Sequence, residues 1–71
     1  MALRTVAKMT PEERTERREF DEAAYHRVRA LLADGMKRPE ALSKAAGQMK
    51  VERRQVVAGY WQHVRRTGAP K

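Results

Sequence analysis

The chain has 71 residues, with 16 Lys and Arg, 9 Asp and Glu, and no cysteine. A chain this short forms one domain with a small core, which disfavours an enclosed active-site cleft. The lack of cysteine excludes disulfides and thiolate metal sites and fits a reducing cytoplasm. Because no apolar run approaches the roughly 20 residues that cross a bilayer, and none resembles an export signal, we expect a cytoplasmic protein without a membrane partner.

The net charge of +7 is concentrated toward the end of the chain. Residues 1–22 contain five basic and six acidic residues, whereas residues 50–71 contain six basic residues and one acidic residue, Glu52. Such a gradient indicates an anionic partner that is met by residues 50–71. The alternative is an ordinary solvated helix face.

A first helix is predicted to begin after Thr10, because Thr10 can cap it and Glu13 completes a capping box. Its first two turns are almost entirely charged, so we expect residues 1–18 to form a flexible, charged N-terminal arm. From Phe20 onward, apolar residues recur at intervals of three and four up to Ala33, before Gly35 ends the helix. The predicted core residues of this stripe are Phe20, Ala24, Val28, Leu31 and Leu32.

Two further helices are expected, one from Pro39 to about Gly47 and one from Val51 to Arg66. Their predicted core residues are Leu42, Ala45, Ala46 and Met49 in the second helix, and Val56, Val57, Tyr60, Trp61 and Val64 in the third. The predicted fold is therefore all-α: a compact three-helix bundle over residues 19–67, with a disordered tail at 68–71. The alternative is one long helix from Pro39 to Arg66, because Gly47 and Gly59 would each cost only about 1 kcal/mol inside it.

The face of the third helix opposite its apolar residues has a composition suited to nucleic acid. A projection at about 100° per residue places Arg54, Gln55, Gln62, Arg65 and Arg66 there, around the small Ala58 and Gly59. Arginine and glutamine match the base edges of guanine and adenine, and arginine also binds phosphate. The candidate residues for binding nucleic acid or another partner are Lys50, Arg53, Arg54, Gln55, Gln62, Arg65 and Arg66.

From about Ala24 to Arg66, the chain resembles the helix-turn-helix superfamily of DNA-binding domains. The resemblance rests on Val28–Gly35 as a first helix and its stop, Leu42–Gly47 as the second helix, and Val51–Val64 as the third. It implies a helix-turn-helix-like fold and a small transcription regulator that binds double-stranded DNA through its third helix. Because a single unit of this size makes few contacts, DNA binding implies a dimer or low specificity.

In size, charge and N-terminal arm, the chain is also similar to small phage proteins that bind bacterial RNA polymerase and alter initiation or termination. That alternative places the protein in the host cytoplasm and assigns the arm to the partner, since a charged arm can fold onto a protein surface. The arm residues concerned are Leu3, Arg4, Val6, Lys8, Arg14, Arg17 and Arg18. RNA binding with Trp61 as a stacking platform and an interfacial membrane helix are less favoured.

No catalytic, metal or cofactor site is expected. His26 and His63 are the only histidines, and there is no third nitrogen or sulfur ligand to complete a plausible zinc site. Ser43 is the only serine, and no histidine is near it in sequence. We therefore expect a non-enzymatic protein without a cofactor.

Overall fold

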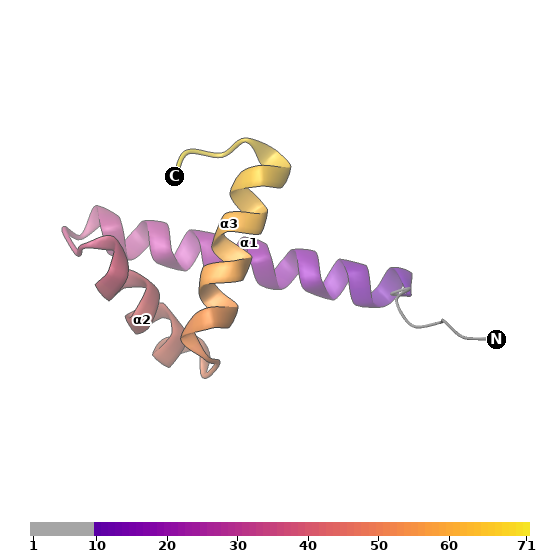
Figure 1. Ribbon diagram of the computed structural model, residues 1–71, viewed down its shortest axis with the longest axis horizontal. Helices are drawn as coiled ribbons and strands as arrows, with labels where there is room; N and C mark the ends of the chain where they lie inside the picture. Colours follow the sequence, from indigo (N-terminus) through magenta and orange to yellow (C-terminus); the bar gives the residue numbers. More distant parts are fainter. Residues whose placement is uncertain (1–9) are drawn as a thin grey trace.

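A computed structural model describes residues 10–71 of the chain as three helices, α1 (Pro11–Ala33), α2 (Arg38–Met49) and α3 (Arg53–Thr67). Figure 1 shows α3 crossing the middle of the long α1, with α2 beside the second half of α1. The first half of α1 extends beyond the other two helices (Figure 1). The predicted all-α three-helix bundle is confirmed, and the alternative of one helix from Pro39 to Arg66 is wrong.

The start of α1 has the predicted cap. The amide of Glu13 donates to Oγ1 of Thr10 at 3.1 Å, and the amide of Thr10 donates to Oε1 of Glu13 at 3.0 Å. This reciprocal pair satisfies two amides that a helix start otherwise leaves free. Residues 11–18, which we assigned to a flexible arm, form the first turns of the same continuous helix that carries the core residues.

The buried core lies where the three helices meet. Small side chains dominate α2, with Ala41, Ala45 and Ala46 all buried, so this helix can approach its neighbours closely. Tyr25, which the apolar stripe did not include, is buried and its ring stacks on that of Tyr60, with centroids 5.4 Å apart. The predicted core residues Phe20, Leu32, Met49, Val57 and Trp61 are only half-buried and pack around the edge of the core.

Residues in the left-handed conformation end both later helices. Lys50 follows α2 with φ 59°, and Gly68 follows α3 with φ 71°. Residues 68–71, which we expected to be a disordered tail, run back toward α1. There the hydroxyl of Tyr25 donates to the carbonyl of Pro70, and Nη1 of Arg29 donates to the carbonyl oxygen of Lys71.

Candidate nucleic-acid interface

The outer side of α3 carries most of the predicted binding residues. Arg54, Gln55, Ala58, Gln62, Arg65 and Arg66 are all exposed and follow one side of the helix. We call these six residues the basic face of α3. Val56, Tyr60 and Val64 are buried on the other side, where they hold α3 against α1 and α2. The core therefore fixes which side of α3 meets solvent.

In the first turn of α3, Glu52 contacts two residues of this face. The amide of Glu52 donates to Oε1 of Gln55 at 2.9 Å, so the side-chain oxygen of Gln55 is engaged in capping the helix. The Gln55 amide nitrogen stays available as a donor. Nε of Arg54 lies 2.7 Å from Oε1 of Glu52, but these side chains are 85% and 66% exposed. An ion pair this exposed is weak and leaves Arg54 free to exchange partners.

Two of the predicted binding residues lie elsewhere. Nε of Arg53 donates to Oγ of Ser43 at 2.9 Å, which ties the start of α3 to α2 and turns Arg53 away from the basic face. Lys50 is exposed in the turn between α2 and α3, beyond the end of that face. The structure therefore does not place these two residues on one surface with Gln62 and Arg65.

Gly59 is not part of the open surface that the helical projection gave it. It is buried against α1, and a Cβ at this position would lie 3.1 Å from Oδ1 of Asp21 and 3.1 Å from Cε2 of Phe20. The lack of a side chain at Gly59 therefore serves the crossing of α1 and α3, and only Ala58 leaves the basic face without bulk.

Asp21 is a site residue that the sequence analysis missed. Its side chain is 3% exposed, and its Oδ2 accepts a hydrogen bond at 3.0 Å from Nη2 of Arg66, whose side chain is 38% exposed. A buried carboxylate requires such a partner. The available signal was its spacing, since Asp21 precedes Ala24 and Val28 by three and seven residues and so shares their buried face.

A groove runs between α1 and the basic face of α3. Phe20 and Asp21 form part of its lining on the α1 side, and Ala58 lies opposite them on α3. Its polar lining is formed by Arg17, Arg54, Gln55 and Gln62. The groove therefore joins Arg17, which the sequence assigns to the arm, to four residues of the basic face, three of them polar.

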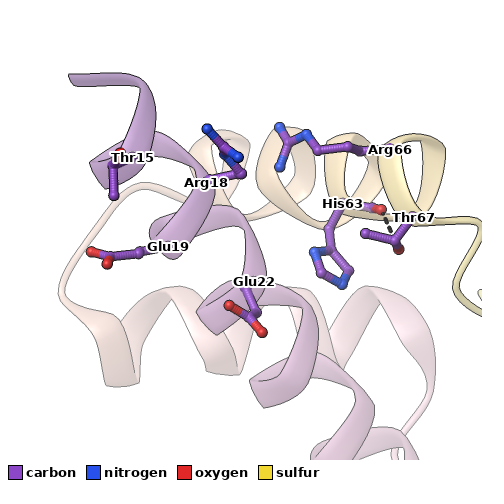
Figure 2. A pocket seen from close by; sticks show the side chains of 7 residues that line it. All are labelled: Thr15, Arg18, Glu19, Glu22, His63, Arg66 and Thr67. Carbon is purple, nitrogen blue, oxygen red and sulfur yellow. Dashed lines mark hydrogen bonds between the residues drawn. The ribbon is translucent and has the colours of Figure 1, made fainter. Parts of the chain in front are cut away.

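A second hollow lies where the first half of α1 meets the end of α3. It is lined by Arg14, Arg17, Arg18 and Arg66, which we call the arginine corner. Arg18 and Arg66 also line the neighbouring pocket in Figure 2, together with Glu19, Glu22 and His63. The remaining arm residues, Leu3, Arg4, Val6 and Lys8, lie outside the described residues.

The two histidines lie near each other, although they come from different helices. The His26 and His63 rings have centroids 5.9 Å apart, and Tyr25 contacts both rings. Within residues 10–71, no group of three or more His, Asp or Glu side chains has the arrangement of a metal site. In the same part of the chain, no helix is both long and apolar enough to cross a membrane.

The fold defines an all-α protein of three packed helices. Comparisons of this chain with protein-family models, with curated proteins and with solved structures give no match.

Proposed function

We propose that this protein is a small non-enzymatic transcription regulator that binds double-stranded DNA through α3. The observation that carries the proposal is the basic face, on which Gln62 and Arg65 are exposed and make no hydrogen bond to another side chain within residues 10–71. An exposed helix that presents arginine and glutamine has donors for base edges in the major groove and for phosphates.

The surroundings of α3 add to this support. The core holds α3 on its apolar side, and the one ion pair that ties the basic face to α1 within residues 10–71 is Arg66–Asp21, so Gln62 and Arg65 stay exposed to a partner. Arg17 borders the same groove as Gln62, which extends the positive surface from α3 onto α1. Because one such unit makes few contacts, specific recognition would require a dimer on a two-part site, and a monomer would bind with low specificity.

The test is a titration of the labelled protein with a random-sequence duplex, followed by backbone amide shifts at two salt concentrations. We expect shifts concentrated in Arg54–Arg66 that collapse at the higher salt, because each phosphate contact contributes about 0.9 to the slope of log affinity against log salt. Charge reversal by R65E should weaken binding, whereas K44E, at an exposed site on α2, is the matched control. A flat salt slope in the unsubstituted protein would exclude DNA as the partner.

Bacterial RNA polymerase is the second candidate partner. The observation that favours it is the first half of α1, which is exposed, almost entirely charged and extends beyond the bundle (Figure 1). Charge reversal by E12K/E16K changes this exposed segment without touching the basic face of α3 or the arginine corner. It should weaken binding to purified polymerase if this segment is the contact, and should not weaken DNA affinity if α3 is.

A further inference from the structure

The arginine corner brings four guanidinium groups together from two helices. Arg14, Arg17 and Arg18 are spaced by three and four residues and so share one side of α1, and Arg66 joins them from α3. Of the glutamates in the same turns, Glu12, Glu16 and Glu19 project about 100° to 200° further around the helix. Glu13 instead projects within about 40° of Arg17, and its carboxylate is engaged in the Thr10 cap. The first half of α1 therefore carries most of its positive charge toward α3 and most of its negative charge on the other side.

Among the described residues, three of these arginines have no carboxylate within ion-pair distance, while Glu13 and Glu22 stand four residues from Arg17 and Arg18 on the same helix. Within residues 10–71, Arg14, Arg17 and Arg18 form no ion pair, and only Arg66 has one, with Asp21. Like charges three and four residues apart on a helix destabilise it. An anion bound among the four guanidiniums would remove this repulsion.

One arginine of the corner, Arg66, is held in place by an ion pair. The buried carboxyl of Asp21 holds Nη2 of Arg66 at 3.0 Å, while the partly exposed guanidinium keeps further N–H groups for another ligand. In Figure 2, the side chains of Arg18 and Arg66 lie next to each other at the edge of the pocket that both of them line. Glu19 and Glu22 line the same pocket from α1. The anion must therefore enter between Arg14, Arg17, Arg18 and Arg66, away from these two carboxylates.

We infer that the arginine corner is a binding site for a phosphate group, and that on DNA it takes a backbone phosphate beside the groove that α3 enters. Guanidinium groups bind phosphate with paired, charge-assisted hydrogen bonds, which makes arginine the residue suited to this ligand. The DNA part of this inference rests on the proposed function, and the phosphate site itself does not. A free phosphate group offers the same chemistry, so the test separates the two sources.

The first experiment compares thermal unfolding of the full chain in inorganic phosphate and in sodium chloride of equal ionic strength. With phosphate at about ten times its Kd, the unfolding midpoint should rise by roughly 6–11 °C. The double variant R17Q/R18Q should lose this rise, and R14Q should lose part of it. R27Q is the matched control for R14Q, because it removes one charge from α1 far from the corner, and R27Q/K44Q is the matched control for the double variant. Both controls should keep the rise. An equal response in all variants would overturn the phosphate site, because phosphate also stabilises proteins without a specific site.

The second experiment measures the affinity of the same variants for a duplex. R17Q/R18Q should reduce the salt slope by about two units and the affinity by roughly tenfold or more at low salt, and R27Q/K44Q, which also removes two charges, should not. If the duplex binds R17Q/R18Q and R27Q/K44Q equally well, the corner does not contact DNA, although α3 still does. If phosphate stabilises the protein but no duplex binds, the proposed function fails and the corner is a site for a free phosphate group.

Discussion

Asp21 on α1 and Arg66 on α3 form an ion pair of 3.0 Å between residues 45 positions apart in the chain. Of the charged residues among 10–71, Asp21 alone is buried. The pair joins the crossing of the two helices to the surface, since Arg66 also lines the arginine corner. One arginine therefore contributes both to stability and to the candidate binding surface.

Loss of the Arg66 guanidinium should destabilise the fold, whereas loss of the Arg65 guanidinium should not. R66Q leaves the Asp21 carboxyl buried without its ion pair, which we expect to reduce the free energy of unfolding by about 2 kcal/mol. R65Q removes an equal charge from an exposed site and should change the free energy of unfolding by less than about 0.5 kcal/mol. Urea denaturation measures both values. Similar values for the two variants would show that the pair contributes little to stability.

Alanine substitutions at two helical glycines should act in opposite directions. Gly47 in α2 has open space around it, so G47A should raise the free energy of unfolding by about 0.5–1 kcal/mol through helix propensity. Gly59 has Asp21 and Phe20 at 3.1 Å from the position of a Cβ, and Asp21 is held by Arg66. We expect G59A to lower the free energy of unfolding by about 1 kcal/mol, even after the gain in helix propensity, because an inserted carbon atom strains a packed contact. Stabilisation by G59A would mean that α1 and α3 can separate freely.

The two core tyrosines should respond differently to loss of their hydroxyl groups. The hydroxyl of Tyr60 is buried and has no hydrogen-bond partner among the described residues, so Y60F should be neutral or stabilise the protein by up to about 1 kcal/mol. The hydroxyl of Tyr25 donates to Pro70, so Y25F should lose about 1 kcal/mol. Thermal unfolding of the two variants under the same conditions gives the comparison, and a larger loss in Y60F would contradict it.

Glycine at position 50 should give a more stable protein than the native lysine. Lys50 ends α2 in the left-handed conformation, with φ 59°, which costs roughly 1–2 kcal/mol for a residue with a Cβ. K50G should therefore stabilise the protein by up to about 1 kcal/mol in denaturant unfolding. K44G, inside α2 on the exposed side, should instead destabilise it by about 1 kcal/mol.

On DNA, glutamine and arginine of the basic face should make separable contributions. After selection of a preferred duplex, Q62A should weaken the binding free energy for that duplex by about 1–3 kcal/mol and leave binding to random-sequence DNA nearly unchanged. The reason is that a base contact contributes to specificity and a phosphate contact does not. R65Q should weaken binding to both duplexes and lower the salt slope by about one unit. Q48A, on α2, serves as the control in competition assays. Uniform weakening by Q62A would assign that residue to phosphate.

Local features of the fold could be read from the sequence. The Thr10 cap, the turn after α1 at Gly35 (φ 95°) and the exposed side of α3 depend on residues within a few positions of one another. Asp21 could not be assigned in this way, because a carboxylate ordinarily indicates an exposed position. Its burial depends on Arg66 and on the space left at Gly59, both of which reach Asp21 only through the crossing of α1 and α3.

The same crossing explains why the sequence assigns residues of one candidate site to two separate predicted surfaces. Arg17 and Arg18 were assigned to an arm, and Arg66 to the third helix, as parts of alternative functions. The angle at which α3 crosses α1 brings these three residues to one hollow. Helical periodicity places a residue on a side of its own helix but does not indicate which residue of another helix lies opposite it.

The oppositely charged sides of the first half of α1 have an electrical consequence. Residues 11–19 contain four glutamates and three arginines, so this segment carries almost no net charge and does not attract a polyanion from a distance. Its charges are separated across the helix and form a transverse dipole moment, which experiences a torque in the field of a polyanion. The excess positive charge of residues 50–71 would attract the protein to the polyanion. The dipole of α1 would then rotate the protein about its long axis, so that the protein is oriented before it makes contact.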